Sequence, residues 1–252
     1  MELYQSILLF LGINLMRYAL FAGVAYFIFY ILKRSSWANR KIQQKYPNSK
    51  QIISEIKHSV LSVFIFALVA LIILTLNKMD VLQVYADVNQ HSWLYFVASV
   101  VILLLFHDTY FYWTHRALHH PKLIKYHLIH HQSHNTTPFT SFSFHPVEAI
   151  VQTGFVFVLV FLPINMYAIA IMLTWQMAFN VIGHLGFEVY PKKFHNSLIG
   201  KQLNTVTHHN MHHRYTNQNF GLYFSFWDRI MKTNHKEYEQ QYNANAEKMY
   251  QS

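Results

Sequence analysis

The chain has 252 residues, of which 53% are hydrophobic, 17% aromatic and only 12% charged, and its net charge is +9. Soluble proteins carry about 25% charged residues, so this composition indicates a membrane protein. The absence of cysteine excludes disulfides, thiolate zinc sites, iron–sulfur clusters and thiolate-ligated haem. Any bound metal must therefore be held by nitrogen and oxygen.

Five apolar stretches approach the length of about twenty residues that a helix needs to cross a bilayer. They run roughly over residues 7–32, 59–76, 93–113, 149–162 and 166–182. The first is too long for the core of a signal peptide and lacks a charged leader, so we expect an uncleaved anchor. The last two flank Pro163-Ile164-Asn165, which we expect to form the tight turn of a helical hairpin whose first arm is short for a full crossing.

These stretches predict an all-α fold, a multi-pass membrane helix bundle of about four or five membrane helices. The segment 33–58 holds seven basic residues, and the positive-inside rule places it in the cytoplasm. Counting crossings from there puts residues 114–148, and the chain after about residue 183, on the same side. Most of the histidines lie in these segments, which we expect to form a histidine-rich helical metal-binding cap on the cytoplasmic face.

The excess of positive charge fits basic residues that flank membrane spans and contact anionic membrane lipids. No basic stripe with exposed aromatic residues stands apart from the apolar stretches, which argues against nucleic-acid binding. The polar tail from about His235 to Ser252 is expected to be a frayed helix or disordered.

Fifteen of the eighteen histidines fall between His107 and His213, and most stand in three tight sets. Residues three and four apart share one face of a helix, so we expect each set to direct two or three imidazoles at one point. Neutral imidazole is the commonest side-chain metal ligand near neutral pH. The sets are His115, His119 and His120; His127, His130 and His131; and His208, His209, His212 and His213.

Eight or more histidines on one face suit two metal ions better than one. A catalytic zinc ion needs only three protein ligands, and the His-Glu-x-x-His protease signature is absent. Two histidine-ligated irons with open positions can activate dioxygen. A site at the cytoplasmic mouth of a bundle would admit a lipid from the bilayer and electrons from the water, so the inferred reaction is oxidation of an unactivated C–H bond in a lipid.

Two other classes of protein fit a histidine-rich membrane chain. A metal transporter would place its ligands within the spans near the bilayer midplane, whereas the sets here lie at or beyond the ends of spans. A bis-histidine haem protein for electron transfer would use one or two axial ligands and leave most of these histidines unexplained.

Six segments, in type, spacing and order, resemble the fatty acid hydroxylase/sterol desaturase superfamily, and most closely its sterol C5-desaturase branch and bacterial relatives. They are DTYFYWTHRALH at 108–119, HLIHH at 127–131, TPFTSFSFHPVE at 137–148, HLGFE at 184–188, THHNMHH at 207–213 and NFGLYFSFWDR at 219–229. The resemblance covers roughly residues 93–233. It implies a catalytic domain over this range, preceded by membrane helices and a basic loop at 1–92 and followed by a polar tail at 234–252.

The resemblance also implies a pair of iron ions held by histidines of the three sets and by an isolated histidine between the second and third. His120 competes with His119 for the first set, and His208 is a ligand or a neighbour. Glu188 stands where hydroxylases have a histidine, and could be a ligand, an acceptor that orients an imidazole or a structural group. The implied ligands are His115, His119, His127, His130, His131, His184, His209, His212 and His213.

As in that superfamily, dioxygen is expected as co-substrate, and a lipid, sterol-like or fatty acyl, as substrate. The sequence has no Gly-x-Gly-x-x-Gly fingerprint, so electrons are expected from a separate donor protein, which could be cytochrome b5-like, a ferredoxin or a reductase. The basic loops are candidate docking surfaces for it. The expected location is the bacterial inner membrane, or the endoplasmic reticulum of a eukaryote, with the active site on the cytoplasmic side.

Overall fold

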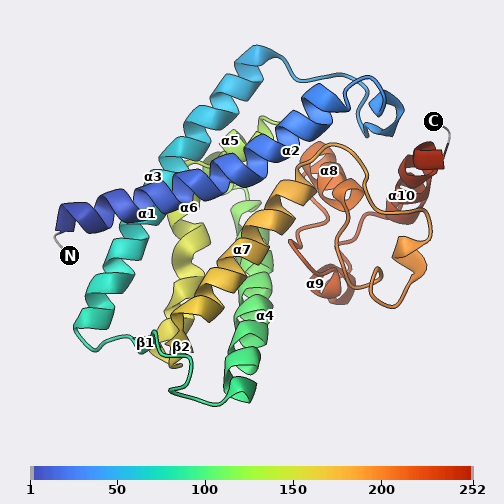
Figure 1. Cartoon of the computed structure of the whole chain (residues 1–252). Coiled ribbons are helices and arrows are strands. Elements are labelled where there is room, and N and C mark those ends of the chain that lie inside the picture. The colour runs from blue at the N-terminus through green and yellow to red at the C-terminus, as the bar shows by residue number, and fades with distance from the viewer. Residues whose placement is uncertain (1–2, 251–252) are drawn as a thin grey trace.

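The computed structural model describes residues 3–250 and confirms an all-α membrane bundle (Figure 1). Four helical stretches are long and apolar enough to cross a membrane, namely Tyr4–Leu32, Ser49–Lys78, Trp93–Leu118 and Met166–Gly183. The first is one continuous helix in which α1 (Leu3–Tyr18) and α2 (Val24–Tyr26) are joined and extended by π-helical turns. The other three are α3, α4 and α7.

Helix α3 begins ten residues earlier than the apolar stretch that predicts it. The Asn48 side chain accepts a hydrogen bond from the Gln51 backbone N–H at 2.9 Å, and this cap starts the helix at Ser49. The basic loop therefore covers only residues 33–48, with a short 3-10 turn at Ala38–Arg40. Hydropathy could not find this start, because the first turns of α3 are polar and extend beyond its apolar part.

The segment after Pro163 forms a short strand instead of a simple turn. Strand β2 (Ile164–Asn165) pairs in parallel with β1 (Val84–Tyr85), and the Asn165 side chain caps α7 by accepting from Tyr167 N–H at 2.9 Å. Helix α6 (Pro146–Thr153) and the 3-10 helix after it, to Val160, carry the chain to this strand pair. The pair lies at the end of the bundle opposite α8 in Figure 1.

The basic loop and the histidine-bearing segments lie at the same end of the bundle. Lys41 Nζ donates to Asn135 Oδ1 at 2.8 Å, and Gln43 Nε2 donates to the His134 carbonyl at 2.7 Å and to Asn210 Oδ1 at 3.1 Å. This confirms that these segments share one side. Short helices complete that end, namely α5 (Leu128–His131), α8 (Val206–Tyr215), α9 (Phe226–Ile230) and α10 (Tyr238–Glu247), with 3-10 turns at Ile124–Tyr126, Pro138–Phe142, Phe194–Asn196 and Lys248–Tyr250.

The expectation of a frayed or disordered tail is wrong for most of its length. Residues 238–247 form α10, which packs against α8. Tyr242 is fully buried in a cluster with Met211 and Tyr238, and its hydroxyl donates to the Pro191 carbonyl at 2.7 Å. The polar composition hid these contacts because the buried face of α10 consists only of Tyr238, Tyr242, Asn245 and Ala246, and one of these four is itself polar.

We predict that Tyr242→Ala loosens the histidine-bearing end of the molecule. Removing a buried aromatic side chain costs about 3–5 kcal/mol, and here a hydrogen bond is lost as well. The melting temperature of the purified protein should fall by several degrees, whereas Asn243→Ala, on the exposed side of the same helix, should leave it unchanged. Equal melting temperatures for all three proteins would show that α10 does not support α8.

Candidate metal centre

Nine of the eleven histidines named from the sequence come together as two groups of imidazoles. Within each group the potential ligand atoms all lie within 4.8 Å of one another. All nine side chains are buried except that of His119, which is half-buried. The larger group is His115, His119, His127, His131 and His212, and the smaller is His130, His184, His209 and His213.

The second set does not aim all its imidazoles at one point, as the spacing had led us to expect. His127 and His131, four residues apart, belong to the larger group, whereas His130 belongs to the smaller. Successive residues of a helix point about 100° apart, so positions i+3 and i+4 share a face but diverge from each other. This one helical turn thus supplies potential ligand atoms to both groups of imidazoles.

The third set repeats this division. His209 and His213, four apart, join the smaller group, while His212 joins the larger. Each of these two sets therefore contributes to both groups, which places the groups next to each other. His131 and His213, one from each group, have ring centroids 4.8 Å apart. The arrangement offers two adjacent nitrogen sites.

Hydrogen bonds to Nδ1 orient His115 and His127 in the larger group. His115 Nδ1 lies 2.8 Å from the Phe220 carbonyl, which can only accept, so Nδ1 carries the proton and Nε2 a lone pair. His127 Nδ1 lies 2.7 Å from Glu148 Oε1, and an ionised Glu148 imposes the same tautomer. The two Nε2 atoms are 3.0 Å apart. Burial raises the pKa of Glu148, and with this carboxyl neutral the two Nε2 atoms can share a hydrogen bond. With Glu148 ionised, two lone pairs would face each other and a cation that bound both would remove their repulsion.

The same pattern continues to His212. Its Nδ1 lies 2.7 Å from the Gln218 carbonyl, which leaves a lone pair on Nε2. His131 Nε2 is 3.0 Å from this atom and 3.1 Å from His127 Nε2. A single proton on His131 cannot satisfy both neighbours fully, whereas one cation would engage all these nitrogens.

His184 is the centre of the smaller group. Its Nδ1 lies 2.7 Å from the Asn180 carbonyl, so its Nε2 also carries a lone pair. Around that atom stand the Nε2 atoms of His209 at 2.9 Å, His213 at 3.1 Å and His130 at 3.2 Å. Four imidazole nitrogens directed at one small space form a donor set for a transition-metal ion, with no thiolate or carboxylate in it.

Burial keeps these imidazoles neutral at pH 7. It lowers the pKa of His131 from 6.5 to about 3, an effect to which neighbouring imidazoles add, and it lowers the pKa of His184 to about 4. Burial and the surrounding rings also hold the pKa of His209 and of His213 well below 6.5. Neutral rings keep the lone pairs that bind a metal ion.

Two buried carboxylates fix the backbone carbonyl that orients His115. Asp228 accepts from the N–H groups of Phe220 at 2.9 Å and Gly221 at 2.7 Å. Asp108, on α4, accepts from Tyr223 N–H at 2.9 Å. These bonds hold the loop after α8 against α4, and with it the acceptor of the His115 proton. Such outer hydrogen bonds set the tautomer and direction of metal-binding histidines.

His120 and His208 belong to neither group. His120 is exposed, because it follows the residue that caps the end of α4 and the chain turns away there. His208 is buried, but its Nε2 faces Asn234 Oδ1 at 3.2 Å and Asp228 Oδ2 at 3.6 Å. In this geometry His119 faces the larger group and His120 does not, and His208 lies beside the groups with polar partners of its own.

Both carboxylate oxygens of Glu188 accept hydrogen bonds from neighbouring protein groups. Its Oε1 accepts from Val189 and Tyr190 N–H, both at 3.1 Å. Its Oε2 accepts from Thr207 N–H at 2.9 Å and Thr207 Oγ1 at 2.7 Å. Oε2 thus binds the first turn of α8 while Oε1 binds the chain just after Glu188, so this carboxylate positions the helix and is not part of either group of imidazoles.

Other histidines near the sets also lie outside both groups. His134 is exposed, and His145 caps α6 by accepting from the Val147 N–H at 3.1 Å. His107 is buried on α4, with its Nδ1 3.0 Å from the Tyr223 hydroxyl.

The sequence did not reveal the groups that orient the ligands. Glu148 stands in a quoted motif, but only the fold brings it 2.7 Å from His127. In the sequence, the available sign of this role was that Glu148 stands one helical turn after the capping residue His145. The carbonyls of Gln218 and Phe220 carried none, because every residue has one.

The comparisons with known proteins agree with this geometry. The model of the fatty acid hydroxylase family matches residues 100–233, just over half of the chain, so the chain belongs to that family. A lathosterol oxidase of Mus musculus is 29% identical over 239 residues, which cover 90% of this chain and 74% of the relative. No solved structure is significantly similar.

Two further relatives match over shorter stretches of the chain. A Delta(7)-sterol 5(6)-desaturase of Gibberella zeae is 29% identical over 146 residues, 57% of this chain and 44% of the relative. One of Leptosphaeria maculans is 34% identical over 134 residues, 52% of this chain and 35% of the relative. The chain thus spans less than half the length of these two relatives.

Adjacent histidines at the end of α4 give a matched test of the larger group. We expect His119→Ala to lower the metal content of the purified protein, because it removes a nitrogen that faces the group. His120→Ala should keep the parental content. Metal per chain is measured by elemental analysis after size-exclusion chromatography. Loss of metal from the His120 variant alone would reverse the assignment.

Proposed function

We propose that this protein is a membrane diiron oxidoreductase that uses dioxygen and external electrons to desaturate or hydroxylate a lipid. The two adjacent groups of five and four imidazoles, in each of which the potential ligand atoms lie within 4.8 Å of one another, carry the proposal, since such nitrogen donor sets suit transition-metal ions. Membership of the fatty acid hydroxylase family and the similarity to sterol desaturases support it.

The two groups of imidazoles would hold one iron ion each. Iron bound there would supply the reductive activation of dioxygen that breaking an unactivated C–H bond requires. The protein's own contribution is to fix the ligands before substrate arrives. Asn180, Phe220 and Gln218 accept the Nδ1 protons through their carbonyls, and Glu148 would do so for His127 when ionised beside a bound cation.

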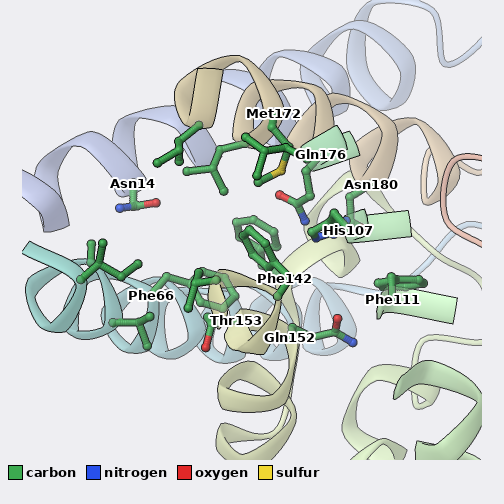
Figure 2. Close-up of a pocket in the computed structure, with 18 of the residues that line it drawn as sticks. Asn14, Phe66, His107, Phe111, Phe142, Gln152, Thr153, Met172, Gln176 and Asn180 are labelled. Atoms are coloured by element: carbon green, nitrogen blue, oxygen red, sulfur yellow. The ribbon is translucent and has the colours of Figure 1, made fainter. Parts of the chain in front are cut away.

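A largely apolar cavity inside the bundle gives a lipid a place beside these groups (Figure 2). It is enclosed by side chains from the four membrane helices and from α6. At one end Phe111 lies with its ring centroid 5.0 Å from that of His115, and Phe144 lies 5.1 Å from His130. A lipid in the cavity would therefore approach both groups from the membrane side, with water excluded by apolar walls.

We infer that electrons arrive from a separate donor protein at the opposite, water-facing surface. Exposed basic side chains lie there in segments that also carry or flank the histidines, namely Lys45, Lys122, Lys125, Arg214 and Lys232. Such a surface would attract an acidic redox partner. By the positive-inside rule, this face is the cytoplasmic one.

Lipid analysis tests the reaction. Cells that express the protein should contain a lipid that has lost two hydrogens or gained one oxygen, measured by mass spectrometry of extracts. Cells with His130→Ala should lack it, because this residue belongs to the smaller group, and cells with His120→Ala should contain it. An iron-loaded, folded parent protein that changes no lipid when supplied with both dioxygen and an electron donor would contradict the proposal.

Cysteine labelling tests the sidedness, since the natural chain has no cysteine. Single cysteines at the exposed positions Ser35, Asn217 and Asn89 would be treated with an impermeant thiol reagent. We expect the first two to be protected in intact cells and labelled after permeabilisation, and the third to be labelled from outside. Labelling of Asn217→Cys in intact cells would place the histidines on the outer face.

A further inference from the structure

An arginine lies near the middle of the first membrane helix, at the wall of the cavity. Arg17 and Asn14 both line this space, and position 17 is close to the centre of the candidate span Tyr4–Leu32. Ionisable residues at this depth are costly and usually have a partner or a function. Figure 2 shows Asn14 at one end of the cavity and Phe111 at the other, with Phe142 and Met172 between them.

Only some of the N–H donors of the Arg17 guanidinium have acceptors in the protein. Arg17 Nη1 donates to Asn14 Oδ1 at 3.2 Å, and Nη2 donates to the Leu173 carbonyl of α7 at 2.7 Å. Both acceptors are uncharged. Arg17 Nε is buried and has no hydrogen-bond partner. The charge is therefore anchored in place, while one of its donors stays unused.

No carboxylate neutralises this charge in the part of the chain that the structure describes. The residues that line the cavity include no Asp or Glu. Glu55 on α3 is occupied elsewhere, since it accepts from Gln51 and Ser133 and, at 2.5 Å, from Thr137. An unpaired positive charge in an apolar wall has a strong preference for an anion.

We propose that Arg17 and Asn14 form an anion subsite that binds the carboxylate of a single-chain lipid, whose apolar body fills the cavity toward the histidines. This inference rests on the proposed function for the identity of the cavity as the substrate site. It selects an acidic lipid among the substrates that the imidazole groups alone would accept. Arg17 is a binding residue in this account and has no part in the oxidation.

The distance between the two ends determines where the lipid would be oxidised. Leu173, which binds Arg17, and His184 are eleven residues apart along α7, which corresponds to roughly 16 Å at 1.5 Å per residue. An extended chain of single bonds advances about 1.2 Å per bond. The reacting carbon should therefore lie on the order of ten bonds from the carboxylate, in the middle of a long acyl chain.

Binding of radiolabelled palmitate and hexadecanol to the purified full-length protein tests the subsite without turnover. The protein would be held in phosphatidylcholine nanodiscs, which contain no anionic lipid. Palmitate should bind about tenfold or more tightly than hexadecanol, because a charge-assisted hydrogen bond to Arg17 needs the carboxylate. Arg17→Gln should remove this preference, and Arg17→Lys should keep most of it.

Lys78→Gln is the matched control, since it removes a positive charge from the exposed end of α3; it should bind both lipids as the parent does. Equal affinities of the parent for palmitate and hexadecanol would overturn the proposal, as would an unchanged preference in a folded Arg17→Gln protein. Displacement of palmitate by added phosphatidylglycerol at equal concentration would assign the subsite to a phospholipid headgroup and also overturn it. Iron content measured in the same samples separates this result from the diiron proposal.

Discussion

The structure depends on nine imidazoles, eight of them buried and that of His119 half-buried, whose nitrogens face one another. In water each ring would hydrogen-bond to solvent, but here backbone carbonyls accept the Nδ1 protons of His115, His184 and His212 and leave lone pairs on their Nε2 atoms. Burying polar groups without partners is costly. A metal ion in each group would turn this cost into a source of stability, because ligands and cation are bound only in the folded state.

The surrounding elements hold the histidine side chains in their orientations. Asp108 and Asp228 fix the loop that presents the Phe220 carbonyl, and Glu188 anchors the start of α8. Helix α10 covers α8 from outside. On the membrane side Phe111 and Phe144 lie against histidines of the two groups and also line the apolar cavity. Polar support on one side and apolar walls on the other match a site that meets both water and lipid.

The sequence was informative where a pattern repeats and uninformative where the fold brings distant residues together. Apolar length predicted the four spans, and the i+4 spacing predicted that pairs such as His127 and His131 share a group. The same spacing rule could not tell that i+3 partners diverge to a second group. It also could not separate His119 from His120, because this depends on where α4 ends. The roles of α10 and of Glu148 depend on contacts across the fold.

Metal stoichiometry tests the central claim most directly. Metal-free protein would be titrated with ferrous iron without oxygen, and bound iron counted per chain, with Mössbauer spectra of the loaded sample. The account predicts two nonhaem irons per chain in the parent and about one when His184, the centre of the smaller group, is replaced by alanine. Binding of a single iron by the parent, or a haem Soret band in the purified protein, would contradict it.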